Sequence, residues 1–118
     1  MDKHFLTEIS HEDFYEVMLD HEFEEPPEDI RTHENKVYGC ATDVWIALID
    51  ENIYYDSTGM FVRGLLSAMI DNLKETNFEN IQQVQLSDFP YITPNRISMR
   101  RMRGLDMALK KIKELLTV

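Results

Sequence analysis

A β-prone segment in the middle of the chain is the feature that most constrains the fold. Residues 44–49 form a continuous apolar run that favours a strand, residues 50–52 are a polar turn, and residues 53–55 resume a strand. Two such runs around a short polar turn predict a β-hairpin. A further short strand is expected before Cys40, which would give a sheet of about three antiparallel strands.

The remainder of the chain has helical patterns. Ser10, followed by Asp13, is a typical helix start, and the Glu-Pro-rich stretch after it ends that helix. Helices are expected over about residues 10–20, over residues 60–73, within residues 77–88 and over about residues 98–116. A helix, a small antiparallel sheet and then several helices predict one α+β domain over residues 1–118, with helices packed on one face of the sheet.

Two predictions concern the core. Trp45 lies two residues inside the strand that follows the turn, so we expect it to anchor the core with its N–H bonded. The last helix shows a period of 3.6 residues, which predicts an inward face. That face would contain Met99, Met102, Leu105, Leu109, Ile112 and Leu116.

Charge is distributed unevenly along the chain, whose formal net charge is −10. Residues 1–35 contain twelve acids and two bases, whereas residues 96–118 contain seven bases and two acids. The acidic balance argues against nucleic-acid binding, which rests on net cationic attraction. The basic tail is therefore expected to fold back on the acidic front or to meet an acidic protein partner. No apolar run is long enough for a membrane span.

Cys40 is the only cysteine, and Gly39 precedes it. Glycine adopts backbone angles closed to other residues, so a thiol on such a turn at the mouth of a strand can be accessible. A free cysteine is also often a buried, inert hydrophobe, and residue type alone leaves both readings open. A single cysteine forms no internal disulfide, which suits a reducing compartment. With no secretory signal at the amino terminus, this predicts a cytoplasmic protein.

Other chemistries are poorly supported by the sequence. Three His-Glu pairs occur, at residues 11–12, 21–22 and 33–34, but none has a second histidine four residues on, so no metal site is predicted. One cysteine cannot build a Cys-rich zinc or iron–sulfur site within the chain. A cysteine hydrolase would need a histidine base, and only His33 is near Cys40 in sequence, although folding could bring another closer.

With these residues in view, the chain resembles the SufE family, the sulfur-acceptor partners of cysteine desulfurases in iron–sulfur cluster assembly. Three segments in the family's order carry the likeness. They are Arg31-Thr32-His33-Glu34-Asn35-Lys36-Val37-Tyr38-Gly39-Cys40-Ala41-Thr42-Asp43-Val44-Trp45, then Asp56-Ser57 with Val62-Arg63-Gly64-Leu65-Leu66, and finally Ile97-Ser98-Met99-Arg100-Arg101-Met102-Arg103-Gly104-Leu105. Thr42, Asp43, Thr58 and Met99 depart from the family's usual residues.

The resemblance implies a SufE/IscU-like fold and a persulfide carried on Cys40, with Arg101 near it or at the partner surface. Gly39, Asp56 and Arg63 would support the site or bind the partner. That partner would be a pyridoxal-phosphate cysteine desulfurase, SufS-like or CsdA-like, and a cluster scaffold would be a downstream acceptor. The chain itself would hold no cofactor and would be an accessory protein rather than an enzyme.

Two functional hypotheses follow. In the first, the Cys40 thiolate accepts sulfur by an exchange reaction, on a loop that is tucked when idle and extended when docked. Arg101 is then the candidate cation near the thiol, and Val37, Trp45 and Met60 are expected to shelter the sulfur. In the second hypothesis the domain binds and activates a partner without carrying sulfur, and Cys40 is merely packed.

Overall fold

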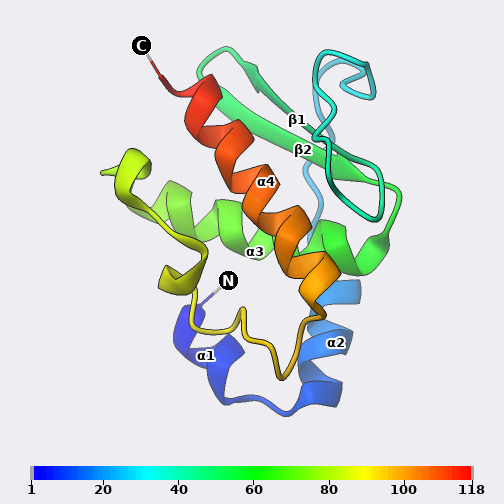
Figure 1. The fold of residues 1–118 in the computed structure, drawn as a ribbon, viewed down its shortest axis with the longest axis vertical. Coiled ribbons are helices and arrows are strands. Elements are labelled where there is room, and N and C mark those ends of the chain that lie inside the picture. Colours follow the sequence, from blue (N-terminus) through cyan, green and yellow to red (C-terminus); the bar gives the residue numbers. More distant parts are fainter. Residues whose placement is uncertain (1, 118) are drawn as a thin grey trace.

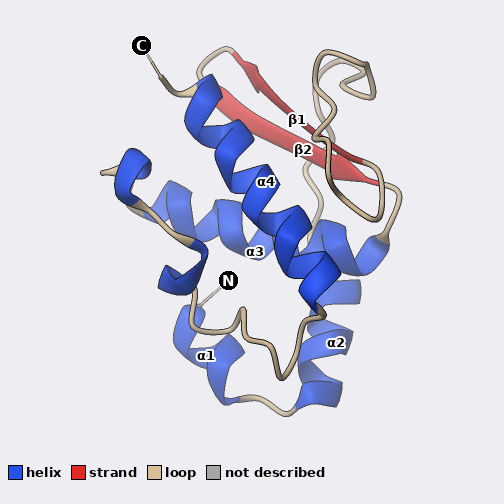
Figure 2. Ribbon diagram, viewed as in Figure 1, coloured by secondary structure: helices blue, strands red, loops and turns tan. Residues whose placement is uncertain are grey.

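An antiparallel hairpin and four α-helices form the fold of residues 2–117, the part of the chain that the computed structural model describes (Figures 1 and 2). In chain order the elements are α1 (Lys3–Glu8), α2 (His11–Leu19), β1 (Val44–Ile49), β2 (Asn52–Ser57), α3 (Met60–Glu75), the short 3-10 helices η1 (Ile81–Gln83) and η2 (Leu86–Asp88), and α4 (Met99–Leu115). The predicted α+β class is confirmed.

The sheet has two strands rather than about three. β1 and β2 pair from Val44 opposite Ser57 to Ile49 opposite Asn52. The expected third strand is reduced to a single bridge between Lys36 and Trp45. Pairing cannot continue past that bridge because the chain leaves the sheet to form the loop that contains the cysteine.

Alternation along the hairpin gives the sheet one core face, against which α3 and α4 pack (Figure 1). The core cluster takes Val44, Ile46, Ile53 and Tyr55 from the two strands, all from the same face. Trp45 lies on the opposite face, and the prediction that it anchors the core is wrong. Its ring is half-buried beneath the guanidinium of Arg31, whose Cζ lies 4.9 Å from the ring centroid. The period of two along a strand makes this placement unavoidable once Val44 faces inward.

The long closing helix begins where the sequence predicts, with the Ser98 hydroxyl accepting a hydrogen bond from the amide of Arg101. Met99 does not face inward as expected: it is 78 % exposed. Met99 is the first residue of α4 and lies before the part of the helix that packs on the core. The first fully buried side chain of α4 is that of Leu105.

Helix α1 is absent from the sequence-based expectations, because six residues are too few to give a periodic pattern. The Asp2 carboxylate caps its first turn. Arg96 secures its end by donating hydrogen bonds to the backbone carbonyls of Leu6, Thr7 and Ile9. Together α1 and α2 lie at the opposite end of the molecule from the sheet (Figure 1).

The basic tail does contact the acidic front, but through backbone atoms rather than carboxylates. Besides Arg96, the Lys111 ammonium donates to the carbonyl of Glu34 at 3.1 Å. Across residues 2–117, no ion pair joins the bases of residues 96–117 to the acids of residues 2–35. Most charged side chains of residues 2–35 and of residues 96–117 therefore face solvent. Among these same described residues, no helix has the length and apolar content to cross a membrane.

Candidate functional site

Cys40 lies on a loop, residues 38–43, whose base is closed by the sheet. The amide of Val37 donates to the carbonyl of Val44 at 2.8 Å, directly across that base. Gly39 has a φ of +92°, in the region that glycine populates easily and other residues rarely adopt. This turn directs the next side chain, that of Cys40, toward α4.

The second end of the loop is fixed to the junction between β2 and α3. The carbonyl of Asp43 accepts hydrogen bonds from the Ser57 hydroxyl at 2.8 Å and from the Thr58 amide at 3.1 Å. The Asp43 carboxylate pairs with the Lys36 ammonium at 3.3 Å, on the surface. Residues 38–42, which include Cys40, lie between these two anchored ends.

The thiol of Cys40 is half-buried against the middle of α4. Its S–H donates to the carbonyl oxygen of Gly104, which lies 3.5 Å from the sulfur. Burial raises the pKa of the Cys40 thiol. In this position the sulfur is sheltered and mostly protonated near neutral pH, since even a free thiol has a pKa near 8.5.

A cavity of about 390 Å³ opens beside the sulfur. It lies between the loop, the start of β1, α3 and the first two turns of α4. Its walls are formed by Cys40, Ala41, Thr42, Val44, Val62, Leu66, Ser98, Arg100, Arg101, Gly104 and Leu105. Val37, Trp45 and Met60, which were expected to shelter the sulfur, do not line this cavity, whose apolar walls come from β1, α3 and α4.

Arg101, the cation expected near the thiol, lines this cavity together with Arg100. Its guanidinium lies over the ring of Phe61, with Cζ 4.7 Å from the centroid. Burial is the cause of the shift in the Cys40 pKa, and it acts in the direction opposite to a nearby cation. In this conformation Arg101 forms part of the cavity wall, and its side chain is exposed.

Asp56 and Arg63 belong to a separate network behind the loop. The buried Asp56 carboxylate accepts a hydrogen bond from Nε of Arg31 at 2.8 Å and lies 3.6 Å from Nη1 of Arg63. Burial raises the pKa of Asp56, but the Arg31 hydrogen bond, the Ser57 amide and the charges of both arginines outweigh it, so the pKa is lowered. Asp56 therefore holds two cations directly before Ser57, the residue that anchors the loop.

The network continues to His21 at the end of α2. Nε of Arg63 donates to Nε2 of His21 at 3.0 Å, while Nδ1 lies 2.6 Å from the carbonyl oxygen of Met18. This pattern requires a neutral imidazole with its proton on Nδ1. Burial and the charge of Arg63 lower the pKa of His21, against the raising effect of the Met18 carbonyl.

The chain is similar in sequence to known proteins. The SufE family model, described as the Fe-S metabolism associated domain, matches residues 3–116. The chain belongs to the SufE family. It is also similar to the cysteine desulfuration protein SufE of Wigglesworthia glossinidia brevipalpis, with 28 % identity over 112 residues, covering 85 % of this chain and 74 % of that protein.

In this SufE chain the predicted site residues thus fall into two groups. Cys40 and Arg101 line the cavity, with Gly39 directly before Cys40, whereas Asp56 and Arg63 meet behind the loop. The roles assigned to all five remain predictions. Sequence reasoning gave no role of their own to Gly104, which lies within the third matching segment, or to Arg31, which is the first residue of the first.

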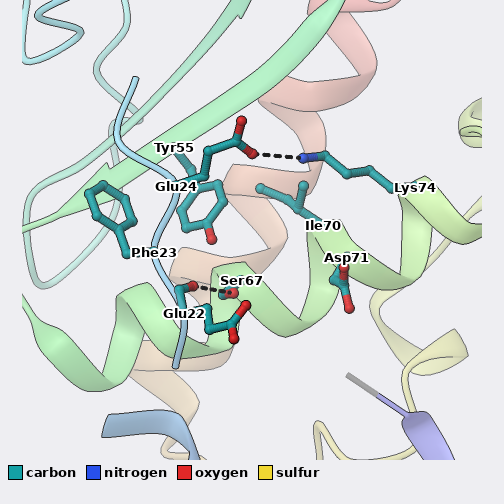
Figure 3. Close-up of a pocket in the computed structure, with 8 residues that line it drawn as sticks. All are labelled: Glu22, Phe23, Glu24, Tyr55, Ser67, Ile70, Asp71 and Lys74. Atoms are coloured by element: carbon teal, nitrogen blue, oxygen red, sulfur yellow. Dashed lines mark hydrogen bonds and ion pairs between the residues drawn. The ribbon is translucent and has the colours of Figure 1, made fainter. Parts of the chain in front are cut away.

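Another pocket, of about 360 Å³, lies between residues 22–24, β2 and α3 of the SufE chain (Figure 3). Glu24 pairs across it with Lys74 at 3.8 Å, and the Ser67 hydroxyl donates to the backbone carbonyl of Glu22 at 3.3 Å. These contacts tie the segment after α2 to α3. The pocket contains no cysteine or histidine, so the candidate site is the cavity beside Cys40. Searching residues 2–117 finds no group of three or more His, Cys, Asp or Glu that could hold a metal ion.

Proposed function

We propose that this chain is a sulfur acceptor and carrier, which takes persulfide sulfur from a cysteine desulfurase onto Cys40 and passes it on for iron–sulfur cluster assembly. Membership of a family associated with Fe-S metabolism supports the setting, and the name of the Wigglesworthia relative, a cysteine desulfuration protein, supports the sulfur source. The single observation that carries the proposal is the placement of the lone thiol on a glycine turn beside a cavity.

The transfer step is an exchange reaction that needs no oxidant. The Cys40 thiolate attacks the outer sulfur of the donor's persulfide, a new S–S bond forms on Cys40, and the donor's own S–S bond breaks. The donor cysteine leaves as a thiolate, and the proton that Cys40 gave up passes to solvent. A second exchange of the same kind delivers the sulfur to the next acceptor.

The half-buried thiol is the idle state in this proposal. Its raised pKa slows attack on small oxidants, and the cavity shelters the sulfur between transfers. Docking would move residues 38–42 outward, while the bonds at Val37 and Asp43 keep the base of the loop in place. The activity over cysteine belongs to the pyridoxal-phosphate partner, which makes this single-domain, cytoplasmic chain an accessory protein.

Mass spectrometry after incubation with a desulfurase and cysteine tests the carrier role. We expect the wild-type chain to gain the mass of one sulfur atom at Cys40, and to lose it on treatment with a thiol reductant. Cys40→Ser, which keeps the size and hydrogen-bonding capacity of the side chain, should gain none. If the serine variant still acquires sulfur, the carrier proposal is wrong.

The half-burial of the thiol also favours a second candidate, a module that activates a desulfurase without accepting sulfur. Cys40→Ala separates the two. A carrier loses stimulation of desulfurase turnover with this substitution, whereas an activating module keeps it. The comparison requires only the rate of alanine release by the partner.

We further propose that the first turns of α4 bind an acidic surface of the partner. Arg100, Arg101 and Arg103 are exposed, Arg100 and Arg101 line the cavity, and within residues 2–117 none of the three forms an ion pair. Replacing Arg100 and Arg101 together by Glu should weaken partner binding at least about tenfold, with a strong dependence on salt. Calorimetric titration at two ionic strengths measures this.

Lys110→Glu is the matched control for that surface. Lys110 is exposed on the same helix, about 15 Å along its axis from Arg100. The control reverses one charge away from the cavity, half the change in net charge of the double variant, and it should alter the affinity by less than about threefold. Equal losses from the control and the double variant would contradict a docking surface centred on the first turns.

A further inference from the structure

Gly104 occupies a position where a helix ordinarily has a side chain. It is the only glycine in α4, it is buried, and glycine in a helix interior is destabilising relative to alanine. A Cβ built on Gly104 would lie 3.3 Å from the Cys40 sulfur and 3.5 Å from the Cys40 Cβ. An alanine methyl would therefore press on the cysteine, which would have to move by a few tenths of an ångström.

The next turn of α4 completes the floor beneath the loop. Met107, three residues on from Gly104, lies under Gly39, where an added Cβ would be 3.3 Å from its Cγ. Residues three apart share a helix face, so two neighbouring loop residues rest on two neighbouring helix positions. The helix surface thus fixes both the depth and the direction of the thiol.

The hydrogen bond between Cys40 and Gly104 has a fixed donor and a fixed acceptor. The S–H of Cys40 donates, and the backbone carbonyl of Gly104, which can only accept, lies 3.5 Å away. A thiolate has no proton to donate, and its charge would face the negative end of the carbonyl dipole. The contact is favourable for the thiol and unfavourable for its anion.

The groups around the sulfur do not offset the cost of burying a Cys40 thiolate at this position. The walls from α3 and β1 are apolar: Val62, Leu66 and Val44. The charged groups of the walls are Arg100 and Arg101 of α4, and the guanidinium of Arg101 lies over Phe61. On the loop side, Lys36 and Asp43 pair with each other.

We propose that Gly104 is a positioning residue, which seats the protonated thiol of Cys40 against α4 and releases it when the sulfur ionises or carries a second sulfur atom. This rests on the proposed carrier function. A second sulfur, about 2.05 Å from the first, cannot extend toward Gly104, where the contact is already close. It must project into the cavity or draw the loop away from the helix, so loading and loop position are linked.

The pH dependence of Cys40 alkylation by iodoacetamide tests whether Gly104 positions the thiol, and it requires no desulfurase. In Gly104→Ala the added methyl should displace the sulfur toward solvent. We expect the rate at pH 7 to rise about threefold or more, because the thiolate fraction below the pKa changes tenfold for each unit of pKa. The midpoint of the pH profile should move to lower pH.

Gly59→Ala is the matched control, since its new methyl would meet the side chain of Thr42 at 3.2 Å and touches the same loop away from the sulfur. Its profile should follow the wild type. The proposed role of Gly104 is wrong if the pH profile of Gly104→Ala coincides with that of the wild type, or if the profile of Gly59→Ala shifts equally. The sulfur-transfer result with Cys40→Ser is independent of either outcome.

A measurement on the wild-type chain avoids any effect of substitution on folding. Methyl methanethiosulfonate converts the thiolate into a methyl disulfide with loss of methanesulfinate, which places a second sulfur on Cys40. The ¹⁵N heteronuclear NOE of residues 39–42 should fall clearly after this modification, while the values in β1 stay unchanged. Unchanged NOE values in residues 39–42 would contradict release of the loop.

Discussion

Gly64→Ala is expected to lower the free energy of unfolding by about 3 kcal/mol or more, because it forces two helices apart. Gly64 is buried in the first half of α3, where α2 crosses it. A Cβ on Gly64 would lie 2.1 Å from the carbonyl oxygen of Met18 and 2.7 Å from its carbonyl carbon. Those are backbone atoms, so no rotamer change relieves the overlap. The gain in helix propensity, about 1 kcal/mol, does not offset it.

Thermal unfolding measures the effect, which should appear as a fall in Tm of about 10 °C or more for a chain of this size. Gly104→Ala is the matched control, since it adds the same methyl to another buried helical glycine, with the nearest atom, the side-chain sulfur of Cys40, at 3.3 Å. Its Tm should change by less than about 4 °C. A Gly64→Ala chain as stable as the wild type would mean that α2 does not pack this closely on α3.

The elements that could be predicted from sequence are those whose signal is local. The hairpin is specified by an apolar run, a polar turn and a second β-prone run, and β1 has the predicted bounds. The closing helix is specified by the Ser98 cap and a long periodic face, and α4 runs from Met99 to Leu115. Local signals also carry the family likeness, which the match over residues 3–116 confirms.

The errors concern contacts between distant segments. Periodicity shows that Met99 and Trp45 are apolar at regular positions, but not whether another element covers them. Met99 precedes the packed part of α4, and Trp45 is covered by Arg31 from the long loop before the sheet. The predicted third strand is absent for a related reason. Pairing on that side of β1 is limited to a single bridge between Lys36 and Trp45.

The candidate site shows the same division. Cys40 and Gly39 could be identified from sequence because a lone thiol beside a glycine is visible in a short run. The arrangement around the sulfur could not, since the floor comes from a helix 64 residues further along the chain. A glycine within a predicted helix, as at Gly104, is the signal that could have located that floor, because glycine there needs a packing reason.

Asp56→Asn is expected to lower the free energy of unfolding by about 2 kcal/mol at pH 7, because it removes the one carboxylate that holds two arginines together. The Asp56 side chain is 13 % exposed, against 18 % for Arg63 and 46 % for Arg31. Solvent around Arg31 reduces the effect below that of a fully buried pair. Asparagine keeps the shape and can still accept a hydrogen bond from the Ser57 amide, so the substitution isolates the charge.

The same network predicts a specific dependence of stability on pH. The pKa of Asp56 is lower in the folded chain than in the unfolded chain, where a value of about 3.9 applies. The unfolded state therefore binds more protons between these two values. The stability from Asp56 is fully present above about pH 4 and is lost as the pH falls through the folded pKa. The difference between the wild type and Asp56→Asn should shrink over that window.

Urea unfolding at pH 7 and at several values below pH 4 measures both effects, and Asp43→Asn serves as the control. Asp43 forms an exposed pair with Lys36, and its loss should cost less than about 1 kcal/mol. Because Asp56 directly precedes the loop anchor Ser57, Asp56→Asn should also speed amide exchange at Ser57 and Thr58. A variant that destabilises the chain without loosening these amides would show that the arginine network supports the core but does not hold the loop that carries Cys40.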